Sequence, residues 1–286
     1  GSDIPQYYNK KPGMVISTSI DKHIYIALNH CMAPHFKVIY SQLELVNKRE
    51  DIKHDRVKAI MDYYDINGNI ELCSFSDIDT RGSGLGSSST FTVGLVNALY
   101  RITHGRNMDT NELAELASYI EIVRCEEPIG KQDHFAAAYG GFNTIHFEGG
   151  KVRVKHLDVD QTTLLQLNHN LIAFNTGINR QASTILSKQV ENLKDINYIE
   201  RTKSMVEMAK QSVKLLQKKK IDDFGALLDD SWQIKKTLSD NVSNTEIDNM
   251  YRHAINNGAI GGKLLGAGGG GYLLVYVPEK NRNRLL

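Results

Sequence analysis

Glycine and serine residues alternate densely in the segment RGSGLGSSST at residues 81–90. Its three closely spaced glycines let the backbone approach a ligand and adopt positive φ angles. The serines lead into an apolar segment at residues 89–102, which predicts a buried helix. Free N–H groups and the helix dipole at such a start favour an anion. The segment therefore predicts a phosphate-binding loop.

Two common phosphate-binding motifs do not fit this loop. A Walker A loop ends in Gly-Lys-Ser or Gly-Lys-Thr, and no lysine is present here. A Rossmann fingerprint needs a second strand after the helix. The next predicted element is instead another helix, at residues 110–124, with Thr110 as its N-cap. A flexible Gly/Ser turn is the remaining alternative, although such a turn rarely leads straight into a buried helix.

Two carboxylates follow in the segment YIEIVRCEEPIGKQDHFAAAYGG. Glu121 lies one step from the apolar stripe of the helix at residues 110–124, so it is either a cleft-facing ligand or a solvated residue. That stripe consists of Leu113, Leu116, Ala117, Ile120 and Arg124. Asp133 begins a short helix after a Gly-containing turn, so it is either a helix cap or a catalytic base. A magnesium ligand and a base are what phosphoryl transfer requires.

A second glycine-rich segment covers residues 258–277. So many glycines weaken a fold entropically, and close backbone approach explains them better than chance. Lys263 within it either approaches an anionic ligand or is solvated. Arg180 suits bidentate recognition of a sugar oxygen or a phosphate, with a surface arginine as the alternative. Trp232, the only tryptophan, is expected in the core rather than as a sugar platform.

The remaining pattern predicts an α+β protein with a ligand cleft between two lobes. The alternation at residues 14–29 predicts a half-buried strand or hairpin. Further strands are expected at residues 36–40, 71–75, 142–147, 151–157, 171–176 and 272–277, and further helices at 51–64, 133–139, 184–217, 222–238 and 245–257. A change of character near residues 166–170 predicts one domain at residues 1–168 and a second at residues 169–286.

The composition limits the classes of partner. The 286 residues carry a net charge of +1, so neither a nucleic acid nor an anionic membrane is expected. No apolar run has the length of a bilayer span, and no signal-peptide pattern is present. The three distant cysteines predict structural thiols in a reducing compartment, and hence a cytoplasmic location. The ten histidines form no HxxxH or HxxEH motif, so a zinc site is not expected.

The loop GSGLGSSST resembles the central motif of the GHMP kinases, a family that includes galactokinase and mevalonate kinase. The resemblance implies a ribosomal-protein-S5-like N-terminal lobe and a ferredoxin-like C-terminal α+β lobe. It also implies ATP and Mg²⁺ as cofactors, with the loop around the nucleotide phosphates. The ATP-binding residues would be Arg81, Gly82, Ser83, Gly84, Leu85, Gly86, Ser87, Ser88 and Ser89.

The order glutamate, Pro-x-Gly turn, aspartate and Gly-Gly is similar to the second block of this family. The resemblance implies that Ser88 and Glu121 hold magnesium and that Asp133 is the base, with Ser87 and Ser89 as alternatives to Ser88. The segment GKQD has one more residue between glycine and aspartate than mevalonate kinase does. The third motif of the family matches the segment at residues 258–277. From these resemblances the expected substrate-binding residues are Asp3, Arg180, Gly266, Gly268 and Gly269.

Segments along nearly the whole chain, among them TGINRQAS and GGKLLGAGGGGYL, resemble the heptose 7-phosphate kinases and their fucokinase-like relatives. This branch implies transfer of the ATP γ-phosphate to the anomeric hydroxyl of D-glycero-D-manno-heptose 7-phosphate, for surface polysaccharide synthesis. Another sugar kinase of the family and a non-catalytic binding protein remain alternatives, and a homodimer remains open. The family pattern also places a strand before Gly1-Ser2-Asp3 and further chain after the third motif.

Overall fold

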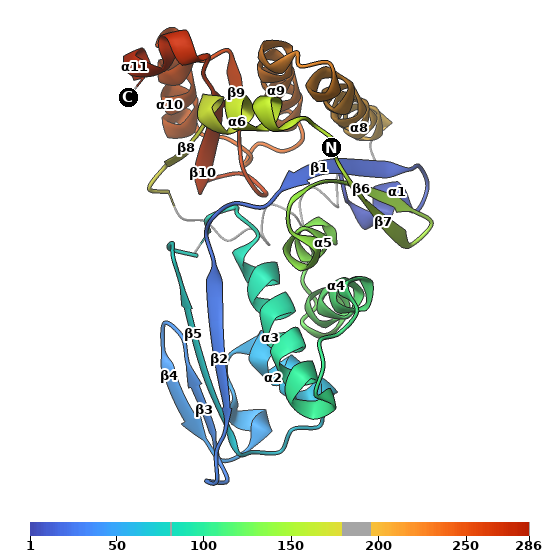
Figure 1. Cartoon of the computed structure of the whole chain (residues 1–286), viewed down its shortest axis with the longest axis vertical. Coiled ribbons are helices and arrows are strands. Elements are labelled where there is room, and N and C mark those ends of the chain that lie inside the picture. The colour runs from blue at the N-terminus through green and yellow to red at the C-terminus, as the bar shows by residue number, and fades with distance from the viewer. Residues whose placement is uncertain (81, 179–195, 286) are drawn as a thin grey trace. The chain divides into compact units, whose positions relative to one another are not determined.

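The structure is a computed structural model that describes residues 1–80, 82–178 and 196–285 (Figure 1). The chain divides into two compact units. The first unit consists of Gly1–Thr18, Arg81–Leu85 and Gly141–Leu286, and the second of Ser19–Thr80 and Gly86–Gly140. Among the described helices, none combines the length and the hydrophobicity that a bilayer span requires.

A four-stranded sheet forms one layer of the second unit, with the order β2-β5-β3-β4. Its strands are β2 (Ile24–His30), β3 (Phe36–Ile39), β4 (Leu43–Val46) and β5 (Ile70–Ser76). β3 and β5 are parallel, and the other neighbours are antiparallel. Alternate side chains on β3 and β5, including Phe36, Val38, Ile70 and Leu72, point into the core and are buried.

Helices cover one face of this sheet (Figure 1). They are η1 (Arg49–Asp51), α2 (Asp55–Tyr63), α3 (Ser87–His104), α4 (Thr110–Tyr119), η2 (Ile120–Arg124) and α5 (Gln132–Tyr139). α3 packs against β2 and also against α4 and α5. Its buried side chains, such as Leu95 and Leu99, share the core with Ile60 and Met61 of α2. The buried helix expected after the glycine loop is therefore confirmed.

The helix expected at residues 110–124 changes type before its end. The last five residues form one π-helical turn, in which the Cys125 N–H donates to the Ile120 carbonyl at 2.9 Å. This i to i+5 bond adds one residue to the turn and shifts the side chains that follow. Arg124, expected in the buried stripe, is exposed and contacts Asp62, whereas Glu121 is fully buried.

The N-cap of α4 also differs from the expectation, since the prediction of Thr110 was wrong. Asp109 is the cap, and its carboxylate accepts from the N–H groups of Asn111 and Glu112 at 2.9 and 3.2 Å. A carboxylate at a helix start satisfies free N–H groups and also interacts favourably with the helix dipole.

The residues expected as one strand or hairpin, 14–29, form two strands in different sheets. β1 (Gly13–Thr18) belongs to the antiparallel sheet β1-β6-β7 of the first unit, whereas β2 belongs to the second unit. The other two strands are β6 (Phe142–Glu148) and β7 (Lys151–His156). The alternation identified strand residues correctly but not their partners, because a period of two sets the buried face and leaves the pairing open.

The other sheet of the first unit has the order β8-β10-β9. Its strands are β8 (Leu171–Asn175), β9 (Gly261–Leu264) and β10 (Tyr272–Tyr276). The helices of the first unit are α1 (Pro5–Tyr8), α6 (Gln161–Asn170), α8 (Ile196–Gln217), α9 (Ile221–Lys236), α10 (Thr245–Asn256), η4 (Glu279–Asn281) and α11 (Arg282–Leu285). α9 packs on β9, with α8 beside it (Figure 1). Trp232 on α9 is fully buried with Leu264 and Val275, so its expected core position is confirmed.

Candidate active site

The carboxylate of Glu121 is the centre of a buried polar cluster in the second unit. Its Oε1 accepts from the Ser88 hydroxyl, and the Ser89 hydroxyl donates to Oε2 at 2.9 Å. Thr92, one turn further along α3, donates to Oε1 at 2.9 Å. Nε2 of His134 lies 2.8 Å from Oε2. Three hydroxyls and an imidazole from α3 and α5 therefore hold one carboxylate on the π-helical turn.

A guanidinium completes this cluster from α2. Nε of Arg56 donates to Oε1 of Glu121, and a terminal nitrogen of Arg56 donates to Oε1 of Glu127 at 2.9 Å. Burial alone would raise the pKa of Glu121. The hydrogen bond and charge of His134, the charge of Arg56 and the Ser88 hydrogen bond outweigh burial, so the pKa of this carboxyl is well below its usual range. Glu121 is therefore a fixed anion.

The start of α3 brings Asp133 close to the same cluster. Gly86 caps α3 with a positive φ of 71°, and a Cβ atom there would lie 3.3 Å from Cγ of Asp133. Asp133 stands in the first turn of α5, whose N-cap is Lys131. The carboxyl group of Asp133 thus lies against the first turn of α3, where Ser88 is exposed to solvent. Within the second unit, the structure brings together Ser88, Glu121 and Asp133.

The other half of the glycine-serine loop belongs to the first unit, where the second glycine-rich segment packs against it. The Tyr272 N–H donates to the Ser83 carbonyl at 3.1 Å. A Cβ atom on Gly84 would lie 2.8 Å from the Leu265 carbonyl oxygen, and one on Gly266 would lie 2.6 Å from Cα of Gly84. The glycines of both segments were expected to let the backbone come close to another group. In the first unit, the backbones of the two segments come close to each other.

The predicted glycines at 266, 268 and 269 lie near this contact in the first unit. Nζ of Lys235 donates to the carbonyl groups of Leu264 and Gly266. Gly268 and Gly269 pack on Val242, whose carbonyl accepts from the Gly269 N–H at 2.9 Å.

Asp3 lies in the first unit, directly after Ser2, which pairs with Met14 of β1. Arg81 and Arg180 lie outside the described residues.

Sequence reasoning missed Arg56 and Thr92 as members of the Glu121 cluster. Thr92 could have been found, since it follows Ser88 by four residues and so shares its helix face. Arg56 carries no such signal, because it precedes Glu121 by 65 residues. His134 was not singled out from the sequence either, and its contact with Glu121 makes it a member of the cluster.

Comparison with known proteins identifies the family. The family model "GHMP kinases N terminal domain" matches residues 51–141, and "GHMP kinases C terminal" matches residues 212–286. The D-glycero-alpha-D-manno-heptose 7-phosphate kinase of Campylobacter jejuni is 32% identical over 302 residues, which cover 99% of this chain and 87% of that protein. The chain belongs to the GHMP kinase family. It is a phosphotransferase that acts on an alcohol group, with ATP as the donor that this family uses.

Solved structures show the GHMP kinase fold as well. The crystal structure of a D-glycero-D-manno-heptose 1-phosphate kinase from Bacteriodes thetaiotaomicron matches with a TM-score of 0.80 at 20% identity, covering 100% of this chain and 86% of that one. Lactococcus lactis galactokinase complexed with galactose matches with a TM-score of 0.75 at 18% identity, covering 99% and 84%. The fold predicted from the resemblance is confirmed.

The residues of the Glu121 cluster fit magnesium by the type of their ligand atoms. Hydroxyl and carboxylate oxygens are the hard ligands that this ion prefers. The Ser88 hydroxyl gives its proton to Glu121 and keeps oxygen lone pairs on the exposed side of the cluster. Glu121 itself accepts five hydrogen bonds, so it can ligate an ion directly only if one of its donors leaves.

Proposed function

We propose that this GHMP kinase transfers the γ-phosphate of ATP to the anomeric hydroxyl of D-glycero-D-manno-heptose 7-phosphate. The observation that carries the chemistry is the meeting of Asp133, Ser88 and Glu121 at the first turn of α3. The Campylobacter jejuni relative, which bears the name of this activity and aligns over 99% of the chain, supports the choice of sugar. The product would enter the synthesis of nucleotide-activated heptose for surface polysaccharide.

The phosphates of ATP would bind residues 81–89, where glycine backbone and the N–H groups at the start of α3 provide hydrogen-bond donors. Ser88 and Glu121 would hold magnesium, which neutralises charge on the β- and γ-phosphates when it is bound. Asp133 would accept the proton of the anomeric hydroxyl as that oxygen attacks the γ-phosphorus. The bond from the γ-phosphorus to the bridging oxygen of ADP breaks in line with this attack.

The sugar would bind residues outside the Glu121 cluster. Asp3, Arg180 and the glycines at 266, 268 and 269 are the candidates, as the family resemblance implies. Asp3 suits a sugar hydroxyl, and Arg180 suits a sugar oxygen or the 7-phosphate. ATP, a sugar phosphate and three free thiols together support a cytoplasmic enzyme.

The test is a ³¹P NMR assay with ATP, Mg²⁺ and four acceptors: heptose 7-phosphate, mannose 6-phosphate, fucose and galactose. A new anomeric phosphate signal with the heptose phosphate alone is the expected result. Transfer to fucose or galactose would keep a sugar kinase and overturn the substrate. No transfer to any acceptor would favour the non-catalytic alternative.

The role of Asp133 is tested in the same assay with Asp133→Asn. Loss of the base should lower kcat by about 10²- to 10⁴-fold, because an amide cannot accept the hydroxyl proton. Asp158→Asn, at an exposed position in the first unit, is the matched control and should keep the wild-type rate. Full turnover by Asp133→Asn that still binds ATP would remove this residue from the mechanism.

A further inference from the structure

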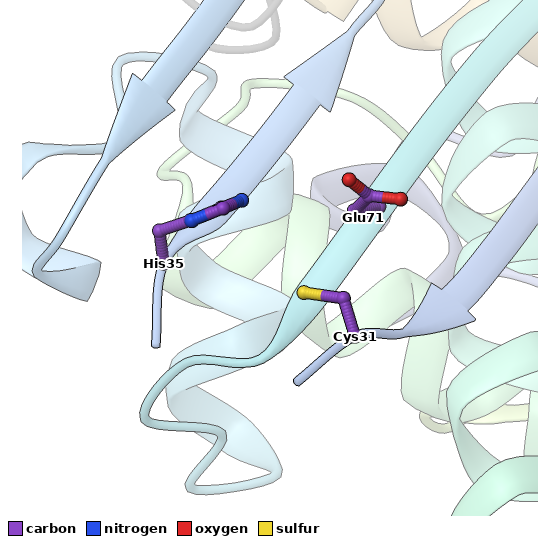
Figure 2. A group of neighbouring side chains, drawn as sticks. All are labelled: Cys31, His35 and Glu71. Atoms are coloured by element: carbon purple, nitrogen blue, oxygen red, sulfur yellow. The ribbon is translucent and has the colours of Figure 1, made fainter. Parts of the chain in front are cut away.

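Three side chains with metal-ligating atoms meet at one end of the second unit's sheet. Cys31 directly follows β2, His35 directly precedes β3, and Glu71 is the second residue of β5. The sulfur, an imidazole nitrogen and a carboxylate oxygen all lie within 4.8 Å of one another. Figure 2 shows the His35 ring and the Cys31 sulfur turned toward each other, with the Glu71 carboxylate beside them.

The backbone at these three positions is held by hydrogen bonds. The Cys31 N–H donates to the Asn69 carbonyl at 2.8 Å, and the Ile70 N–H donates to the His35 carbonyl at 3.2 Å. The side-chain amide of Asn69 donates to the Cys31 carbonyl at 3.2 Å. Glu71 pairs with residues of β2 and of β3. The backbone of these residues is therefore positioned by strand pairing and by the hydrogen bonds next to it.

The ligand atoms are weakly engaged by their neighbours. The Cys31 thiol points at the Ala33 carbonyl at 3.4 Å. The Glu71 oxygens lie 3.5 Å from Nζ of Lys37 and 3.4 Å from the amide of Asn29, and 37% of the Glu71 side chain is exposed. Among the described residues, the His35 ring has no hydrogen-bond or ion-pair partner. All three side chains are half-buried, so an ion can reach them from solvent.

We propose that Cys31, His35 and Glu71 bind one zinc ion, with water as the fourth ligand. Zinc takes thiolate, imidazole and carboxylate ligands in a tetrahedral site, and its bond lengths place the ligand atoms about 3.5 Å apart. A thiolate favours zinc over the harder ions magnesium and calcium. Binding releases the thiol proton of Cys31 to solvent. The ion would join the loop after β2 to β5, at residues that are not part of the Glu121 cluster.

A search for histidine motifs cannot find this group, because its members are brought together by strand pairing. Cys31 and His35 are four residues apart, but Glu71 follows His35 by 36 residues. The parallel pairing of β3 with β5, Phe36 opposite Ile70 and Lys37 opposite Glu71, brings it beside them.

Cobalt and zinc titrations of the whole chain test the proposal. Cobalt should bind at one equivalent with a thiolate-to-cobalt charge-transfer band in the near ultraviolet, and zinc should displace it. Cys31→Ser should abolish the band, and His35→Gln or Glu71→Gln should weaken zinc binding at least about tenfold, the loss that even second-shell changes cause. Zinc should raise the Tm of the wild type and not of Cys31→Ser, whereas magnesium should have the same effect on the Tm of both proteins.

Matched controls are available beside each ligand. Cys73→Ser, two residues after Glu71 on β5, and His30→Gln, at the exposed residue before Cys31, should keep both the band and the zinc affinity. The proposal is overturned if cobalt gives no thiolate band, if Cys31→Ser binds zinc like the wild type, or if the band is lost in Cys73→Ser instead. The kinase rate with Mg²⁺ and ATP should be the same in Cys31→Ser and in the wild type.

Discussion

Two glutamates of the second unit are held in opposite ways. Glu121 is fully buried, and one guanidinium, one imidazole and three hydroxyls surround its oxygens. Glu71 is partly exposed, and its contacts with Lys37 and Asn29 are long. A carboxylate saturated by its own protein orients the groups around it but accepts a new ligand only by losing a donor. A loosely held carboxylate is ready for a ligand, although it contributes little to the fold.

The largest expected difference between the two is in stability. In Glu121→Gln, the side chains of Arg56 and His134 lose their anionic partner at a fully buried position. The free energy of unfolding should therefore fall by about 3–5 kcal/mol. Glu71→Gln should change it by no more than about 0.5 kcal/mol, as usual for surface substitutions. Urea unfolding followed by circular dichroism measures both. Equal losses for the two variants would mean that Glu121 is not the stabilising centre of its cluster.

The cationic partners of the two glutamates should also contribute unequally to stability. Loss of the partner of Glu121 should destabilise the protein more than loss of the partner of Glu71, with a smaller difference than for the glutamates themselves. Arg56→Met leaves Glu121 without its guanidinium, and a loss of about 2 kcal/mol is expected, below the fully buried range because 21% of the Arg56 side chain is exposed. Lys37→Met, beside Glu71, should cost at most about 1 kcal/mol. Calorimetric Tm values test this pair, and a larger decrease for Lys37→Met would reverse the comparison.

The Ser88 hydroxyl connects the saturated carboxylate to the predicted magnesium site. Ser88→Ala removes an oxygen that we expect on the metal, so the Mg²⁺ concentration for half-maximal kinase rate should rise about 10- to 100-fold. Ser87→Ala is the neighbouring control and should leave the Mg²⁺ requirement unchanged. A larger effect in Ser87→Ala would move the metal role to that serine.

The smallest expected difference lies between the wild type and Glu121→Gln, in how the unfolding free energy depends on acid pH. The pKa of Glu121 is raised by burial but lowered further by His134, Arg56 and Ser88, and it ends below its usual range. The stabilisation is therefore complete above the unfolded-state pKa of about 4.3 and is lost as pH falls below it. Without Mg²⁺, the unfolding free energy of the wild type should decline more steeply below about pH 4 than that of Glu121→Gln. Parallel declines would count against a depressed pKa.

The linear motifs predicted the local features of the site well. The glycines and serines before an apolar segment predicted the loop and the helix α3 that follows it. The Gly-containing turn before Asp133 predicted that this residue lies at the start of a short helix. Features that depend on distant residues could not be predicted. Arg56 meets Glu121 only because α2 packs beside the π-helical turn, and Cys31 meets Glu71 only through strand pairing.

Helical periodicity failed at one informative place. A regular α-helix through residue 124 would leave Glu121 at the border of the apolar stripe, where it is either a cleft-facing ligand or a solvated residue. Residues 120–124 form a π-helical turn instead, and Glu121 within it is fully buried. Such turns occur frequently at functional sites, and a departure from the 3.6-residue period is not visible in the sequence itself.

Because Trp232 is buried, its intrinsic fluorescence reports on the folding of the residues around it. It is the only tryptophan in the chain, and it lies in the core of the first unit. Tryptophan emission will therefore follow the loosening of that unit alone, while far-ultraviolet circular dichroism follows both. A mismatch between the two transition curves would reveal whether the Glu121 unit and the tryptophan unit unfold as one cooperative body or in separate steps.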